Sequence, residues 1–198
     1  MLEVLYEDNH IIAVVKPAGV LSQGDKTGDV SMLEEVKKYL KEKYKKPGNV
    51  FVGLLHRLDR PVSGIMLFAK TSKGASRLSE QFRNRKVEKT YHALVFGNPK
   101  EKRGTLINGD MVLHYQVERE GEYSLLKIQI EGGKHHQIRI QLSKAGMPIV
   151  GDVKHGGPVW SDKKAIALCA TGISFTPATV DKMVDLSIAI PVWTLDNE

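Results

Sequence analysis

The sequence lacks any hydrophobic run long enough to cross a bilayer. Its longest apolar runs, residues 11–15 and 64–69, fall far short of the roughly 20 residues that a membrane-spanning helix needs. Residues 1–7 show no basic region followed by an apolar stretch, so we expect no signal peptide. These features predict a cytoplasmic protein without a membrane partner.

Cysteine is almost absent, because Cys169 is the only one in the chain. An intramolecular disulfide and a cysteine-based zinc site are therefore both impossible. The flanking residues Ala167, Leu168 and Ala170 are small or apolar, which predicts that Cys169 packs in the core as a small hydrophobic side chain.

Acidic residues are outnumbered, with 23 Asp and Glu against 29 Lys and Arg, for a net charge of +6. A basic chain is consistent with a polyanionic partner, although many basic proteins bind no nucleic acid. The 41% hydrophobic and 26% charged content excludes a disordered or fibrous chain. A length of 198 residues suits one domain with a sizeable core.

Hydrophobic patterning predicts many strands and few helices. Strands are expected over residues 2–7, 11–16, 51–55, 65–69, 89–96, 104–107, 112–118, 123–131, 166–171 and 186–190. Helices are expected over residues 31–44, 71–84 and 136–144, the first opened by a capping box of Ser31 and Glu34. Without regular strand–helix alternation this indicates an α+β fold. Residues 97–104 are the expected place for a soft boundary between halves.

The densest polar cluster, His-Arg-Leu-Asp-Arg at residues 56–60, lies between two predicted apolar strands. Arg57 and Arg60 flank Asp59, and nearby positive charge favours the ionised carboxylate. A polar loop between strands is a rigid way to present reactive groups. The same spacing fits an Arg–Asp salt bridge that merely closes a loop, and spacing alone leaves both interpretations open.

The motif at residues 56–60, followed by Ser63 and Gly64, resembles the signature of the RluA-type pseudouridine synthases. Further stretches resemble that family in the expected order along most of the chain, at residues 16–20 (Lys-Pro-Ala-Gly-Val), 89–95 (Lys-Thr-Tyr-His-Ala-Leu-Val), 133–139 (Gly-Lys-His-His-Gln-Ile-Arg) and 168–170 (Leu-Cys-Ala). The resemblance implies one catalytic domain over residues 1–198, with a mixed, largely antiparallel β-sheet core and flanking helices and loops.

The resemblance also implies roles at the matching positions. Asp59 would be the catalytic nucleophile or base at the ribose of a target uridine, and Arg139 would pair with it. Tyr91 would pack on the uracil ring, and Ile138 would form part of an apolar wall. Arg57 would enter the RNA in place of the flipped nucleotide. Since the isomerisation moves no electron or phosphate, we expect no cofactor.

Other basic residues are candidates for contacts with RNA phosphates. Arg60 belongs to the signature, and Arg83, Arg85 and Lys86 cluster just before the tyrosine-bearing strand. The lysines of the first predicted helix are better explained as a solvated face; they are Lys37, Lys38, Lys41, Lys43, Lys45 and Lys46.

No metal site is expected. His135 and His136 are adjacent, and adjacent residues on a helix or strand do not face one ligand together. A metal-dependent nuclease or hydrolase would need carboxylates and histidines at ligand spacing. A non-catalytic RNA-binding or ribosome-assembly protein on the same scaffold is the alternative function. Such a protein would have no need to keep Asp59, Tyr91 and Arg139 together.

The sequence departs from the family's common pattern at Lys134 and His135, at Pro61 and Val62, and at His155. These departures concern which RNA is read, ribosomal or transfer RNA, and not the presumed catalytic residues. The early loop begins at Lys16, so we expect no extra N-terminal RNA-binding domain. A monomer that recognises a stem-loop through its catalytic surface is the resulting expectation.

Overall fold

A computed structural model of the protein describes residues 2–193. The strands within them are β1 (Val4–Glu7), β2 (Ile11–Lys16), β3 (Gly53–Leu54), β4 (Ser63–Ala69), β5 (Glu88–Phe96), β6 (Arg103–Asn108), β7 (Met111–Arg119), β8 (Tyr123–Glu131), β9 (Leu168–Phe175) and β10 (Val184–Ser187). The helices are α1 (Met32–Lys43), α2 (Ser72–Arg83), α3 (Gln137–Lys144) and the 3₁₀ turn η1 (Val153–His155). None of these helices is long and apolar enough to cross a membrane.

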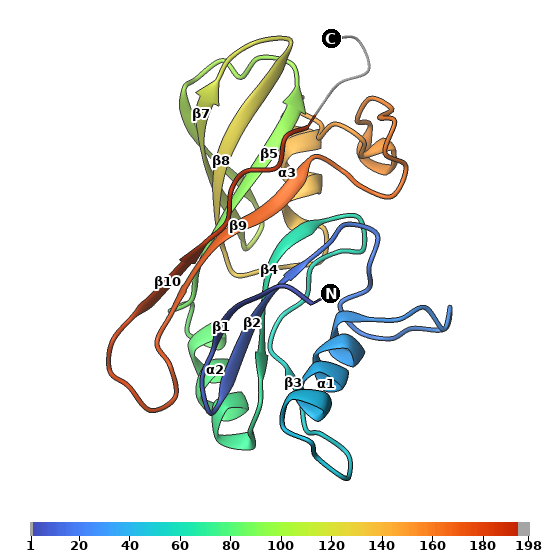
Figure 1. The fold of residues 1–198 in the computed structure, drawn as a ribbon. Coiled ribbons are helices and arrows are strands. Elements are labelled where there is room, and N and C mark those ends of the chain that lie inside the picture. Colours follow the sequence, from blue (N-terminus) through green and yellow to red (C-terminus); the bar gives the residue numbers. More distant parts are fainter. Residues whose placement is uncertain (1, 194–198) are drawn as a thin grey trace.

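All ten strands belong to one sheet, ordered β1-β2-β4-β9-β5-β8-β7-β6, with β10 beside β9 and β3 beside β4. Among these strands, only β4 and β9 pair in parallel. The expected mixed, largely antiparallel α+β fold is therefore confirmed. Figure 1 shows β1, β2, α1 and α2 in the lower part of the molecule and β5, β7, β8 and α3 in the upper part.

Both faces of the sheet are covered where β2 and β4 pair. Side chains alternate across a strand, so Ile12 and Val14 join the cluster that holds α1, while Ile11 and Ala13 join the cluster that holds Leu78 of α2. A strand buried on both faces is apolar throughout, which explains the unbroken run in β4. Each large apolar side chain buried here contributes about 1.5–3 kcal/mol.

In the other part of the sheet, β5-β8-β7-β6, strands β6 and β8 alternate between more and less exposed residues, whereas β5 has an unbroken buried run. Helix α3 covers one side of it, where Gln141 donates hydrogen bonds to the carbonyl oxygens of Leu106 and Met111. The sheet is continuous across the segment 97–104 because residues 90–96 of β5 pair with β8. The soft boundary expected there does not divide the sheet.

Three strands differ most from their predicted ranges. The strand expected over residues 166–171 is Leu168–Phe175, because it continues along β5 and β10. The strand expected over residues 51–55 is only Gly53–Leu54, because β3 pairs with the last two residues of β4 and Phe51 stays 52% exposed. The strand expected over residues 186–190 is Val184–Ser187, where it pairs with β9. The capping box of Ser31 and Glu34 is confirmed at the start of α1.

Candidate active site

The loop between β3 and β4 carries Asp59, and the segment that follows β2 holds this loop in place. Ser22 Oγ donates to the Leu58 carbonyl oxygen at 2.6 Å and accepts from the Leu58 amide at 3.0 Å. Gly64, at the start of β4, has φ +124° and lies so close to Ala170 that a Cβ would approach its carbonyl oxygen within 2.3 Å. Only glycine fits there, and the Asp59 loop is thereby pinned against β9.

Lys16 is the second anchor of this loop. Its side chain is fully buried, and its Nζ donates hydrogen bonds to the carbonyl oxygens of Pro17, Val20 and Arg60 at 2.7–3.0 Å. Burial lowers the pKa of Lys16 to about 8, although the charge of Asp59 acts in the opposite direction. An ammonium group that satisfies three carbonyl oxygens fixes the turn on which Asp59 stands.

Arg139, on α3, joins two carboxylates. Its Nε and Nη2 each bond an oxygen of Asp152 at 2.7 Å, and its Nη1 lies 3.1 Å from Asp59 Oδ2. The Arg139 side chain is 6% exposed and that of Asp59 is 25% exposed. Burial opposes the charge of Arg139, but hydrogen bonds to Asp152 and Asp59 raise its pKa above the ordinary value. The predicted pairing of Asp59 with Arg139 is present in the structure.

Tyr91, on β5, lies in the same cleft and is only 7% exposed. Burial raises the pKa of its phenol above the ordinary value, and the nearby Asp59 carboxylate adds to this shift. The ring is therefore a neutral, flat surface beside the carboxylate. Ile138, buried on α3, supplies apolar wall in the same cleft.

The cleft that contains these residues has a volume of about 860 Å³. It brings together Asp59 from the β3–β4 loop, Tyr91 from β5 and Arg139 from α3, which are distant in sequence. Within the described residues, Asp59 Oδ2 takes the ion-pair contacts to Arg139 and His136, and none involves Oδ1. One carboxylate oxygen is thus held while the other is available to a substrate.

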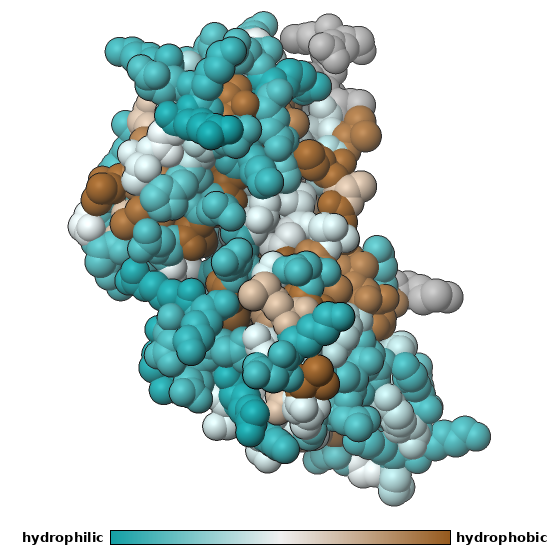
Figure 2. Space-filling view, turned by 90° about the vertical axis from the view of Figure 1, so that its left-hand side faces the viewer, coloured by the Kyte–Doolittle hydropathy of each residue, from teal (hydrophilic) through white to brown (hydrophobic). Residues whose placement is uncertain are grey.

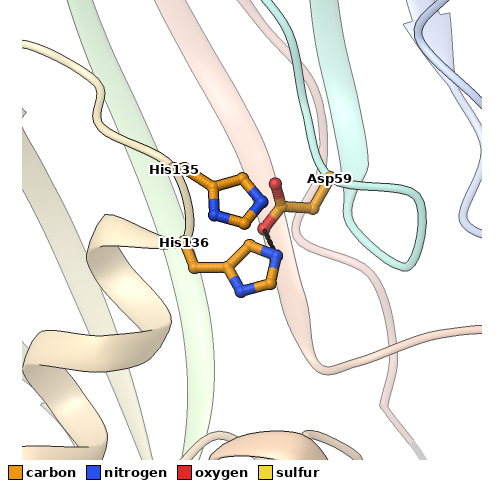
Figure 3. A group of neighbouring side chains, drawn as sticks. All are labelled: Asp59, His135 and His136. Atoms are coloured by element: carbon orange, nitrogen blue, oxygen red, sulfur yellow. Dashed lines mark ion pairs between the residues drawn. The ribbon is translucent and has the colours of Figure 1, made fainter.

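Histidines also lie beside the carboxylate of Asp59. His136 Nε2 lies 3.6 Å from Asp59 Oδ2, and His136 Nδ1 lies 3.0 Å from His155 Nε2. Figure 3 shows that the rings of His135 and His136 lie one against the other beside Asp59. Their centroids are 3.8 Å apart with an interplanar angle of 21°. Burial lowers the pKa of His136, with Arg139 also lowering it and Asp59 opposing.

The expectation that adjacent histidines diverge is wrong for this pair. His136 stands at the start of α3 with φ 55°, in the left-handed region, and so belongs to neither a regular helix nor a strand. The left-handed turn brings the two rings to the same side of the chain. The rule for regular elements does not apply where the backbone changes direction.

Comparisons with known proteins place this chain in a family. Residues 10–144 match the family model described as RNA pseudouridylate synthase. The chain belongs to this family. It is 33% identical to tRNA pseudouridine synthase C of Yersinia pestis, over 79% of this chain and 71% of the relative. It is 31% identical to ribosomal large subunit pseudouridine synthase D of Pseudomonas aeruginosa, over 79% of this chain and 54% of that protein.

The solved structure of human RNA Pseudouridylate Synthase Domain Containing 4 has the same fold. Its TM-score is 0.79 at 20% identity, with 96% of this chain and 88% of that chain covered. Among the curated family members, tRNA pseudouridine synthase C of Pectobacterium carotovorum is 32% identical over 79% of this chain, and 48% of its own length is covered. The chain thus spans from about half to 71% of the length of these curated relatives.

The predicted RNA-contacting residues of this family member divide into two groups. Arg57 and Arg60 line the cleft, whereas Arg83, Arg85 and Lys86 are exposed around the end of α2, outside its lining. Arg57 makes no hydrogen bond or ion pair with the described residues, and so its guanidinium is available.

Arg60 and Arg85 already have partners. Arg60 pairs with Asp29 at 2.6 Å and donates to the Gly19 carbonyl oxygen at 2.9 Å. Arg85 pairs with Glu131 at 3.1 Å. Figure 2 shows that much of one face of the molecule is hydrophilic, with apolar patches between.

Sequence reasoning missed Asp152, which lies on a loop that no periodic pattern marks. His155 was noted only as a departure from the family pattern, and Lys16 only as part of a loop motif. One signal was present for Asp152, which directly follows an apolar run and Gly151. A buried arginine on α3 also needs more acceptors than one carboxylate offers.

Proposed function

We propose that this chain isomerises uridine to pseudouridine in structured RNA. The observation that carries the proposal is the Asp59–Arg139 pair, at 3.1 Å, in one cleft with the buried ring of Tyr91. The names of the relatives, which include a tRNA and a ribosomal large subunit pseudouridine synthase, support an RNA substrate of one of these two kinds.

The reaction breaks the bond between C1′ and N1 of the uridine and forms one between C1′ and C5. The hydrogen on C5 leaves and N1 gains one, so the product is an isomer of the substrate. Asp59 acts at the ribose as nucleophile or base, and Oδ1 is the oxygen free to do so. Arg139 holds Oδ2, which keeps the carboxylate aimed during the reaction.

The detached uracil must turn within the cleft without escaping. The ring of Tyr91 offers a stacking surface for a flat base, and Ile138 closes the apolar side. A base inside a duplex is unreachable, so the target nucleotide must flip out at a cost of a few kcal/mol. Arg57, exposed at the cleft and without a partner among residues 2–193, is the side chain that fills the vacated space.

We also propose that the chain acts as one monomeric catalytic domain in the cytoplasm. The continuous ten-stranded sheet supports a single domain. No cofactor is needed, because the isomerisation transfers no electron and no group between molecules. Side chains of the chain itself supply every role that the mechanism assigns to the protein.

Asp59→Asn tests the proposal, because it preserves size but removes the charge. We expect isomerisation to be lost while RNA affinity stays within about a few-fold, since phosphate contacts supply most of the affinity. The target is first mapped by chemical probing of pseudouridine in cells with and without the gene. Asp185→Asn, at an exposed position of β10, is the matched control. Substantial turnover by Asp59→Asn would refute the catalytic assignment.

A further inference from the structure

Asp59 and two histidines form a group of three potential metal ligands in the cleft. Asp59, His135 and His136 each place one ligand atom within 4.8 Å of the other two. Within residues 2–193 this is the only such group of histidine, cysteine and carboxylate side chains. Figure 3 shows a nitrogen of each imidazole directed toward the carboxylate.

The hydrogen bond between His136 and His155 can set which nitrogen of His136 carries the lone pair that binds a metal. At 3.0 Å, His136 Nδ1 and His155 Nε2 share one proton. When neutral His136 donates that proton, its Nε2 carries a lone pair that faces Asp59 Oδ2 across 3.6 Å. Two acceptors then face each other, and a cation between them satisfies both. A metal-binding histidine commonly donates its other N–H in this manner.

The distances suit a small tetrahedral ion. Zinc bonds of about 2.0–2.2 Å to nitrogen and oxygen place neighbouring ligand atoms roughly 3.4 Å apart. The 3.6 Å between His136 Nε2 and Asp59 Oδ2 is close to that separation. His135 is exposed and its ring makes no hydrogen bond among the described residues, so it can turn out of the stack to complete the site.

The local charge also permits a cation. Arg139 lies beside Asp59, but its guanidinium is already paired with both oxygens of the buried Asp152. Asp59, Asp152 and Arg139 together therefore carry one net negative charge. Two further cations work against binding: the buried Lys16, whose charge interacts with that of Asp59, and the solvent-exposed Lys154.

We propose that Asp59, His135 and His136 bind a divalent transition-metal ion of the zinc type, and that the bound ion inhibits the chain. Two imidazoles and one carboxylate are a donor set that zinc accepts, with a fourth position left for water. The ion occupies the carboxylate that must reach the ribose, so it competes with the flipped uridine. This inhibition rests on the proposed function, whereas the binding does not.

Direct binding is tested first, without RNA. The protein is titrated with Co²⁺, whose visible absorption reports nitrogen and oxygen coordination, and the Co²⁺ is then displaced by Zn²⁺. We expect His135→Ala to weaken Zn²⁺ binding at least about tenfold, and His155→Ala to weaken it by about 10–100-fold through loss of the orienting hydrogen bond. His114→Ala is the control, because His114 lies 3.4 Å from Glu131 on β7 and β8, outside the proposed ligand group.

Inhibition is tested next with the mapped RNA. Zn²⁺ should raise the apparent KM of the wild type, and His135→Ala should need at least about ten times more Zn²⁺ for the same effect. Each variant is compared with its own turnover in chelator, which controls for zinc bound by the RNA. Equal Zn²⁺ affinity in wild type and His135→Ala overturns the site, and equal inhibition of the two overturns the competition. Zinc binding without any uridine isomerisation in chelator would instead refute the proposed function alone.

Discussion

Arg139 depends on Asp152 for most of its hydrogen bonding. The two side chains are 6% and 1% exposed, so removal of Asp152 leaves a buried guanidinium with only one acceptor group. We expect Asp152→Ala to lower the free energy of unfolding by about 3–5 kcal/mol, measured by urea denaturation. Turnover by the folded protein should fall too, because the guanidinium that aims Asp59 loses its support.

Asp185→Ala is the control for this prediction, since it removes an exposed aspartate from β10. Its unfolding free energy should stay within about 0.5 kcal/mol of wild type. A loss below about 1 kcal/mol for Asp152→Ala would mean that the buried pair contributes little to stability.

Arg57 offers a test of base flipping. Arg57→Ala should reduce turnover on an ordered stem-loop more than on an RNA whose target uridine is already unstacked. Only the stem-loop requires the free energy of unstacking the uridine before reaction. Single-turnover rates on the two RNAs measure the difference. Arg77→Ala removes an exposed arginine of α2 outside the cleft and should affect both substrates equally little. Equal losses on both RNAs for Arg57→Ala would contradict the flipping role.

Among single residues, the pair of Asp59 and Arg139 was predictable only through the family resemblance. Charge and spacing at residues 56–60 fitted a structural salt bridge equally well, and the partner lies 80 residues away. The roles of Asp152 and His155 were not predictable from local patterns. Both residues lie in turns, and their contacts with Arg139 and His136 form only when tertiary packing brings distant segments together. The stacking of His135 on His136 depends on one left-handed φ angle, which no periodicity encodes.

At the scale of elements, Glu7 joins β1 to its neighbours. Its carboxylate pairs with Lys43 of α1 at 2.7 Å and with Lys70 at 2.6 Å, and accepts from Tyr44 at 2.6 Å. Burial works against the charged carboxylate, but hydrogen bonds from Lys43, Lys70 and Tyr44 lower its pKa from 4.5 to about 2.

A lowered carboxyl pKa stabilises the folded state above pH 4.5, and this stabilisation is lost as the pH falls toward 2. Glu7→Gln should therefore be less stable than wild type near pH 6 by about 1 kcal/mol, allowing for solvent screening at the exposed Lys43. The gap should close toward pH 2 in urea denaturation. Glu42→Gln, exposed on α1, should show no such pH dependence, and a constant gap for Glu7→Gln would contradict the linkage.

Elements with strong local patterns were predicted well. The ranges of β2 and β8 agree with the predicted residues, because turns bound a buried apolar run in one case and an alternating run in the other. The lengths of β3 and β10 were not predictable, since a short edge strand ends where its partner's free edge ends. The order of strands in the sheet was not predictable from local patterns either, because β4 and β9 pair across about 100 residues of chain.

At the scale of the molecule, the basic charge of the chain bears on how large an RNA the chain needs as a substrate. A net charge of +6 and the exposed side chains of Arg57 at the cleft and of Arg83 and Lys86 around the end of α2 offer phosphate contacts. We expect a short hairpin with the target uridine to be turned over by this chain about as well as the full RNA. The affinity should fall steeply with salt, with a logarithmic slope of about −0.7 to −0.9 for each phosphate contacted.

The measurement is kcat/KM on the minimal hairpin and on the full RNA or assembled particle at several salt concentrations. The same hairpin with cytidine at the target position is the binding control. An inert hairpin beside a reactive large substrate would show that recognition extends beyond the local stem-loop.

The order of strands in the sheet has a consequence for how the chain acquires its active site. Asp59 and Arg139 are 80 residues apart, and they meet only after β4 has docked beside β9. Closing a loop of that length costs about 4 kcal/mol of chain entropy before any distant contact repays it. High contact order of this kind delays completion of the native topology. Folding intermediates that contain only local hairpins and helices therefore have no assembled catalytic pair.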